Sequence, residues 1–374
     1  MLATSRNGAP HALRTAVVWG ITWAFLLWAM PPAAATVLFA GGEDIDFSCI
    51  GACTTNSTAG YFRSGYARTT YSATVASSAD PPTNRFLTPT FTNSSTIWIH
   101  AENYSAAAAG TTTANQAIGV YGSGGVRRLL LRGTGTTGQV KISTRNSAGT
   151  ITDLVTCTSG GWPTSSSLNK LDWYINYAVA GHTTLYSNGV QICDYSGDIT
   201  TDGVTSLSQV DFANPCGGAC AGNPIYWSEI IVATTDTRDM NLFTCYPAAN
   251  GTNMAWSGSY TNVNPTTVND GSAITTASAA QVAEFTCPSL PSGQWLVPAV
   301  AQSARIQIGT TGPQHFRWIV RPAGGSDYDN GSDESGTTSF GNYYNIWPTN
   351  PATSGAWAPA DIGTGFNEGI KSAT

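Results

Sequence analysis

The sequence predicts an all-β protein made of stacked antiparallel sheets. Short runs alternate apolar and polar residues, 40 glycines and many serines, threonines and asparagines fill the intervals, and helical periodicity is almost absent. Alternation with a period of two gives a strand one face for a core and one face for solvent. Turn-forming clusters separate these runs at short spacing, which is typical of a sandwich.

The clearest strands form a predicted three-stranded meander. Residues 171–179 alternate with a period of two, and a turn at 180–182 leads into a strand at 183–187. The Asn188-Gly189 pair favours a tight hairpin because both residues tolerate positive φ, and 190–195 completes the meander. Further strands are expected at 96–101, 117–121, 127–132, 139–144, 151–156, 225–233, 242–246, 282–286, 295–304 and 315–321.

The first 35 residues have the composition of a secretory signal. Arg6 and Arg14 precede an apolar run at 16–30, and alanines at 33–35 offer a peptidase site. The run of about 15 residues is shorter than the roughly 20 that a bilayer span needs. We expect export and no membrane contact after cleavage, with an uncleaved anchor as the alternative.

The remaining chain is expected to form two modules. A polar stretch at 234–240 follows a buried type of strand, and alternating runs resume beyond it. The predicted organisation is a signal at 1–35, a first module at 36–235 and a second module at 240–374. Only 10% of the residues are charged and the net charge is −6. A nucleic-acid binder would need a basic patch, so no nucleic-acid partner is expected.

Eight cysteines in an exported chain predict disulfides. Two pairs are separated by four residues, and two longer pairs match by strand position or by sequence context. A metal site built from the closely spaced thiolates is the alternative, and export argues against it. The expected bridges are Cys49–Cys53, Cys157–Cys193, Cys216–Cys220 and Cys245–Cys287.

Several segments carry a family resemblance. They are LDWYINYAVAGHTTLYSNGVQICDYSGD (171–198), YWSEIIVATTDTRDMNL (226–242), FAGGEDIDF (39–47), TGPQHFRWIVRPAGGSDY (311–328) and NIWPTNPATSGAW (345–357). Together they resemble the laminin-G/concanavalin A-like jelly roll of the type found in tailed-phage virion proteins of tails and fibres. The resemblance implies a jelly-roll sandwich at 36–235 followed by a second β-sandwich module at 240–374.

We expect a secreted or virion-surface protein without catalytic activity, which contacts a glycan or a partner protein through jelly-roll loops. A purely structural fibre or surface-layer subunit, formed as a homo-oligomer, is one alternative. A glycan-cleaving enzyme on this fold is another, because concanavalin-like folds include glycosidases that use two carboxylates. Glu43, Asp44 and Asp46 come closest, since Asp44 and Asp46 share a face if the segment is extended. No further acid follows at strand spacing, so we expect no catalytic residues.

Exposed aromatic rings that stack on sugars are the expected binding groups, while Trp98 and Trp173 are assigned to the core. The candidates lie in polar, loop-like contexts: Tyr104, Trp162, Trp256, Tyr260, Tyr343, Tyr344 and Trp347. No cofactor is required, although an acidic loop offers oxygen ligands for calcium from Asp327, Asp329 and Asp333. Its glycine lies one place early for an EF-hand, which favours a plain solvated loop.

Overall fold

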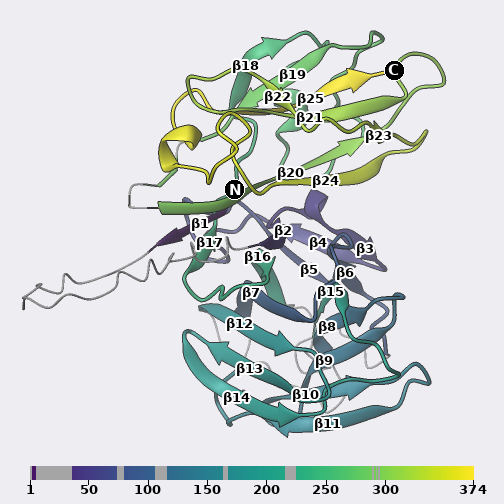
Figure 1. Ribbon diagram of the computed structural model, residues 1–374, viewed down its shortest axis with the longest axis vertical. Helices are drawn as coiled ribbons and strands as arrows, with labels where there is room; N and C mark the ends of the chain where they lie inside the picture. Colours follow the sequence, from purple (N-terminus) through teal and green to yellow (C-terminus); the bar gives the residue numbers. More distant parts are fainter. Residues whose placement is uncertain are drawn as a thin grey trace, which may run out of the picture.

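The described part of the chain folds into four antiparallel β-sheets with three very short helices (Figure 1). This computed structural model describes residues 2–5, 36–73, 80–105, 116–162, 167–214, 225–288, 290–291, 293 and 295–374. The all-β prediction is therefore confirmed. The helices are η1 (Asp44–Asp46), α1 (Tyr260–Val263) and η3 (Pro359–Ile362).

The first half of the chain forms a sandwich of two large sheets. Their strand orders are β11-β10-β9-β8-β15-β6-β3 and β14-β13-β12-β7-β16-β5-β4, with β2 beside β16. The first sheet contains β11 (Ile151–Thr156), β10 (Val140–Arg145), β9 (Arg127–Gly133), β8 (Gln116–Gly122), β15 (Leu207–Ala213), β6 (Arg85–Leu87) and β3 (Ser48–Ile50). The second contains β14 (Val190–Gly197), β13 (Gly181–Ser187), β12 (Leu168–Asn176), β7 (Thr96–Ser105), β16 (Ile225–Ala233), β5 (Thr70–Ala73), β4 (Cys53–Asn56) and β2 (Val37–Gly41).

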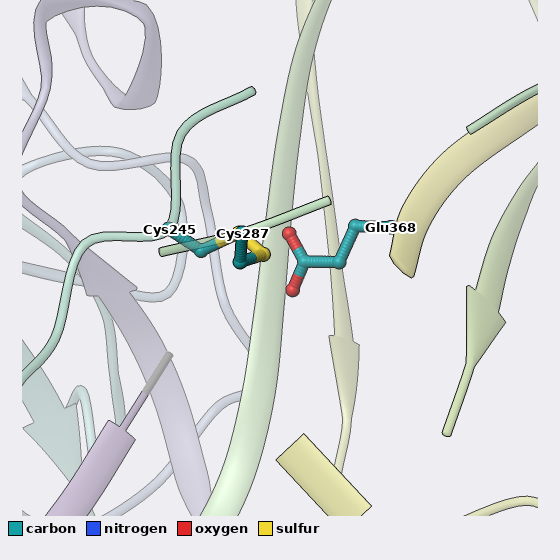
Figure 2. Close-up of side chains that lie close together, drawn as sticks. All are labelled: Cys245, Cys287 and Glu368. Atoms are coloured by element: carbon teal, nitrogen blue, oxygen red, sulfur yellow. A yellow bond between two sulfur atoms is a disulfide. The ribbon is translucent and has the colours of Figure 1, made fainter. Parts of the chain in front are cut away.

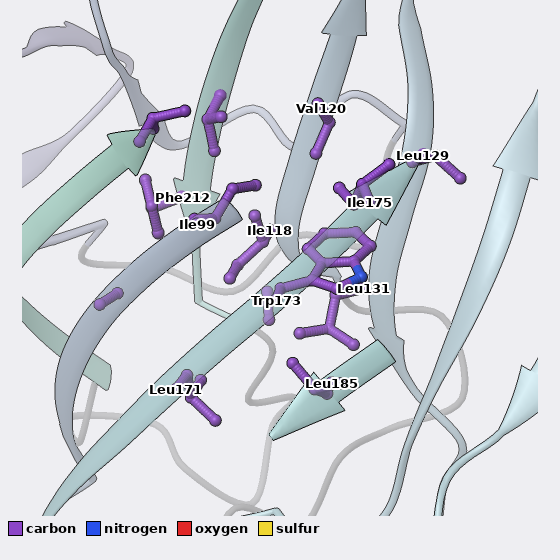
Figure 3. Packing of buried hydrophobic residues seen from close by; sticks show 14 of the residues in the cluster. Ile99, Ile118, Val120, Leu129, Leu131, Leu171, Trp173, Ile175, Leu185 and Phe212 are labelled. Atoms are coloured by element: carbon purple, nitrogen blue, oxygen red, sulfur yellow. The ribbon is translucent and has the colours of Figure 1, made fainter. Parts of the chain in front are cut away.

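The core of this sandwich lies between the inward faces of the two sheets (Figure 3). Trp173 of β12 is fully buried, and its indole N–H donates to the hydroxyl of Thr183 at 2.8 Å. In the expected meander, Trp173 pairs with Leu185 of β13. Leu129 and Leu131 of β9 enter the same core from the other sheet. The period-two pattern therefore located this core correctly.

Trp98 is a correction to the predicted core. Its neighbours Ile97 and Ile99 are buried, so the strand period turns Trp98 to the outer face of the sheet. There its ring centroid lies 5.0 Å from that of Tyr174, and the Arg238 guanidinium lies 5.4 Å from it. The size of a side chain therefore does not predict its burial on a strand, because its position in the period-two alternation decides which face of the sheet it lies on.

The second half, together with β1 from the N-terminal end of the chain, forms two further sheets around their own core. Their orders are β17-β1-β20-β24 and β18-β19-β25-β21-β22, with β23 beside β21. Trp318, Trp357 and Phe366 lie at the centre of that core. The first sheet contains β17 (Met240–Leu242), β1 (Leu2–Ser5), β20 (Trp295–Ile306) and β24 (Gly341–Trp347). The second contains β18 (Ala249–Met254), β19 (Val282–Thr286), β25 (Asn367–Ala373), β21 (His315–Arg321), β22 (Tyr328–Asp329) and β23 (Glu334–Ser335).

The predicted signal is only partly covered by the described residues. Residues 2–5 form β1, which pairs with β17 on one side and β20 on the other. Residues 6–35 lie outside the described part of the chain, so the cleavage prediction stays a prediction. Within the described part, no helix has the length and apolar character to cross a membrane.

The segment from β2 to η1, residues 37–46, joins the two halves. Tyr344 of β24 donates its hydroxyl to the carbonyl of Ala40 at 3.1 Å and accepts from the Ala40 N–H at 2.6 Å. The Ser303 hydroxyl of β20 donates to the carboxylate of Asp46. Figure 1 shows the purple β2 between the two groups of sheets. This segment therefore belongs to the first sandwich by strand pairing and to the second half by contact.

Three of the four expected disulfides are present in the described residues. They join Cys49 to Cys53, Cys157 to Cys193, and Cys245 to Cys287. The Cys157–Cys193 bridge is buried in the first core. The Cys216–Cys220 pair lies outside the described residues, so that bridge stays a prediction.

Candidate functional site

A cavity of about 710 Å³ lies between the C-terminal sheets and the β2–η1 segment. This volume is within the roughly 300–1,000 Å³ typical of ligand sites. Its wall combines carboxyl groups with aromatic rings, a mixture that suits a polar ligand with flat faces. The carboxyl residues are Glu43, Asp44, Asp46, Asp270 and Glu368, and the aromatic ones, apart from His315, are Tyr246, Trp256, Phe285, Phe316, Trp318 and Phe340.

The helix η1 supplies the first acidic part of the wall. Asp44 and Asp46 would share one face only in an extended segment, and the chain instead forms a short helical turn here. Asp46 accepts hydrogen bonds from two backbone N–H groups at 2.6 and 2.8 Å. Asp44 accepts instead from the Thr55 hydroxyl at 3.1 Å and from the Val268 N–H at 2.9 Å. The turn therefore ties both carboxylates to the surrounding structure.

Glu43 lies next to η1 and is paired with a cation. The Arg68 Nε donates to its carboxylate at 3.2 Å, while another guanidinium nitrogen donates to the carbonyl of Asn264. Burial raises the pKa of Glu43 to about 7, although Arg68 acts in the opposite direction. Burial also raises the pKa of the Asp46 carboxyl. This wall therefore holds carboxyl groups that take up a proton more readily than exposed ones.

Glu368 of β25 forms the second acidic part of the wall, beside the Cys245–Cys287 bridge (Figure 2). One carboxylate oxygen of Glu368 and the two sulfurs lie within 4.8 Å of one another. Both sulfurs are bonded to each other in the disulfide, so the group of Cys245, Cys287 and Glu368 offers no thiolate to a metal. The Glu368 Oε1 is buried without a hydrogen-bond partner. Burial raises the pKa of this carboxyl to about 7.

Trp256 provides a well-anchored ring on the wall. Its indole N–H donates to the carbonyl of Gln281 at 3.0 Å, and the side chain is half-buried. Trp318 and Phe316 of β21 lie edge to face, 5.7 Å apart, where the cavity meets the core. An anchored ring with one open face can stack on a flat ligand at little cost in side-chain entropy.

Trp256 alone among the seven predicted aromatic residues lies on the cavity wall. Tyr104 lies elsewhere, on β7, with its ring stacked 4.1 Å from that of Tyr61. Tyr260 begins α1 away from the wall. Tyr343 packs edge to face on Phe316 at 5.0 Å. The structure therefore does not gather the predicted rings into one surface.

Trp162, Trp347 and Tyr344 are corrections to the predicted glycan-binding set. Trp162 is 1% exposed and belongs to the first core. Trp347 is 7% exposed, and its indole N–H donates to the side chain of Gln302 at 2.6 Å. Tyr344 is bound to the β2 backbone through its hydroxyl. Trp162 and Trp347 are too buried to stack on a ligand, and the hydroxyl of Tyr344 is used at the junction with β2. Polar neighbours in sequence therefore did not keep these side chains at the surface.

The predicted calcium ligands pair with cations instead of converging on one point. Asp333 accepts from the Arg317 Nε at 2.5 Å, and Asp329 lies 3.3 Å from the ammonium nitrogen of Lys371. Asp327 forms an ion pair with Arg321. Among the described residues, the trio around Glu368 is the one group of three whose ligand atoms lie this close together.

Comparison with solved structures shows sandwich folds. The chain is similar to the endo-β-1,4-glucuronan lyase of the fungus Trichoderma reesei (10% identity, TM-score 0.40, 55% of this chain and 98% of that one). It is also similar to the globular domain of T. cruzi calreticulin (9%, 0.34, 54% and 88%) and to an alginate lyase (11%, 0.28, 53% and 96%). No family model matches, and no curated protein matches. Likeness at this level concerns the fold alone.

These findings correct the expectation that the chain is not an enzyme. The matched sandwiches include polysaccharide lyases, so this type of fold does not exclude catalysis. On the cavity wall, burial raises the pKa values of Glu43 and Glu368 to about 7, although burial also raises that of Glu284 to about 7 and that of Glu229 to about 8 away from the cavity. Such groups are typical of functional sites. None of these three similar structures is a virion protein, so that part of the resemblance stays a prediction.

Sequence reasoning missed Glu368 and Arg68. For Glu368 a signal existed, because it alternates with two apolar residues that pack in the core, Phe366 just before β25 and Ile370 within it. An acid on the apolar face of a strand indicates either a buried ion pair or a polar site. For Arg68 the local sequence held no signal, since its partners Glu43 and Asn264 are distant in the chain.

Proposed function

We propose that this protein recognises a glycan and that the ligand occupies the cavity beside η1 and β25. The observation that carries the proposal is a cavity lining that combines the anchored Trp256 ring with the carboxyl groups of Glu43 and Glu368. Sugar rings present apolar faces that stack on aromatic side chains. Their hydroxyl groups donate to carboxylate oxygens, and such charge-assisted hydrogen bonds are the stronger kind.

We further propose that the protein acts outside the reducing cytosol, after export by its N-terminal segment. The three disulfides support this, because such bridges persist in oxidising compartments. The virion surface named by the sequence resemblance is one such place. There, recognition of a glycan would serve attachment, and self-association would be an accessory feature.

Binding to a glycan array, followed by calorimetry on the hits, tests the function. Trp256→Ala is expected to weaken binding at least tenfold, which corresponds to about 1.4 kcal/mol. Tyr104→Ala is the matched control, because it removes a half-buried aromatic ring that lies away from the cavity. Absence of any glycan ligand, or loss of binding in the Tyr104 variant alone, would contradict the proposal.

A further inference from the structure

Charge on the cavity wall is unbalanced. Five carboxyl side chains line the cavity, together with two arginines and His315. Both arginines are already used by carboxylates: Arg68 binds Glu43, and Arg305 binds Asp270 through two nitrogens at 2.6 and 2.7 Å. The wall therefore carries more acid than its own cations can neutralise.

Glu368 is the carboxyl group that this arrangement leaves without a partner. Asp44 and Asp46 are held by backbone and hydroxyl donors. Among the described residues, Glu368 forms no ion pair, and its buried Oε1 accepts no hydrogen bond. The side chain as a whole is only partly buried, so a ligand in the cavity that brings a donor to the accessible side of this carboxyl group offsets part of the cost of leaving it unpaired.

Strand β25 places the carboxyl group of Glu368 on the cavity wall. Glu368 lies on the cavity-facing side of β25, in line with Ile370 and Ser372. Figure 2 shows its carboxylate directed at the Cys245–Cys287 bridge, which carries no hydrogen-bond donor. The bridge therefore leaves the carboxylate unsatisfied while it limits how far the side chain can move.

We propose that the glycan carries a free amino group, as in a glucosamine unit, and that Glu368 binds this ammonium. The inference rests on the proposed function and names its substrate class. An ammonium supplies both the missing positive charge and the missing donor. A neutral hydroxyl supplies the donor alone, and charge-assisted pairs are about twice as strong as neutral ones. Glu368 is then the residue that determines specificity for the amine.

Three oligosaccharides with the same linkage and length test the inference: one of glucosamine, one of N-acetylglucosamine and one of glucose. The wild-type protein is expected to bind the glucosamine form at least tenfold more tightly than the other two, as measured by calorimetry. Glu368→Gln is expected to remove that preference. The control Glu334→Gln, on β23 and away from the cavity wall, makes the same chemical change and is expected to keep it.

The outcomes separate this inference from the function on which it rests. Equal binding of the three sugars by the wild-type protein, with weakened binding in the Trp256→Ala variant, would overturn the amine and keep the glycan. A preference that survives in the Glu368→Gln variant would also overturn the role of Glu368. Absence of binding to all three sugars, and to every glycan on the array, would overturn both proposals. The comparison of the three oligosaccharides uses the wild-type protein alone, so it is informative even if a variant fails to fold.

Discussion

Replacement of Glu368 by glutamine should change how the stability of the protein depends on pH. The pKa of this carboxyl rises from 4.5 to about 7 on folding, because burial disfavours the charged form. Between these two values the native state holds a proton that the unfolded state has lost. The free energy of unfolding therefore falls as the pH rises through this window.

The size of the effect follows from the same numbers. One pKa unit corresponds to about 1.4 kcal/mol, so ionised Glu368 costs at most about 3 kcal/mol at pH 8, less where solvent in the cavity screens the charge. Glutamine resembles the protonated acid. Glu368→Gln should therefore exceed the unfolding free energy of the wild-type protein by less than about 1 kcal/mol at pH 5, near the start of this window, and by up to about 3 kcal/mol at pH 8.

Urea unfolding followed by tryptophan fluorescence, at pH 5 and pH 8 with the disulfides intact, measures both differences. The wild-type protein should itself be more stable at pH 5, because burial raises the pKa of Glu43 to about 7 and that of Glu229 to about 8 in the same direction. Glu334→Gln controls for the change in total charge. An equal effect of Glu368→Gln at both pH values, or none at pH 8, would refute the reasoning.

Three further changes test the fold. Replacement of Cys157 and Cys193 by alanine should lower the unfolding free energy by about 4 kcal/mol in urea, because the bridge closes a loop across 36 positions. Trp173→Ala should cost about 3–5 kcal/mol and lower the midpoint in guanidinium chloride, since the indole is fully buried. Tyr344→Phe removes the hydroxyl bound to Ala40 and should cost about 1–2 kcal/mol in thermal unfolding.

Each of these changes has a control in the same molecule. Removal of the Cys49–Cys53 bridge, whose partners are four positions apart, should cost only about 2 kcal/mol. Trp98→Ala should cost far less than Trp173→Ala, because Trp98 lies on the outer face of its sheet. Equal costs within either pair would contradict the roles assigned to loop length and burial. For Tyr344→Phe, an unchanged melting temperature would show that the junction with β2 does not depend on this hydroxyl.

Strand periodicity predicted the sandwich well because it is a local property. The meander from β12 to β14 follows from alternating residues and from the Asn188-Gly189 turn, where Asn188 has a φ of 50°. The errors in predicted burial arose where a side chain was assigned from its size or from the polarity of its neighbours in sequence. Trp98 was assigned to the core for its size, and strand parity places it on the outer face instead. Trp162 was assigned to the surface for its polar neighbours, and the loop that follows β11 places its ring in the first core.

The candidate site could be predicted only in part, because its walls come from distant segments. The three acids from Glu43 to Asp46 stood out in the sequence, although the turn at η1 did not. Their encounter with Glu368 depends on how β2, β20 and β25 come together, and no local pattern encodes that. The alternation of residues around Glu368 carried a usable signal. A search for two acidic residues on one strand, however, does not detect a single buried acid.

The segment from β2 to η1 has a consequence for how such a protein changes over generations. Its residues line the cavity together with Trp256 and Glu368, which come from the other half of the chain. A recombination event that exchanged either half for a foreign one would separate these two groups of lining residues and erase the site in a single step. The outer loops of the two halves can therefore diverge independently. The cavity, in contrast, is kept only when both halves are inherited together.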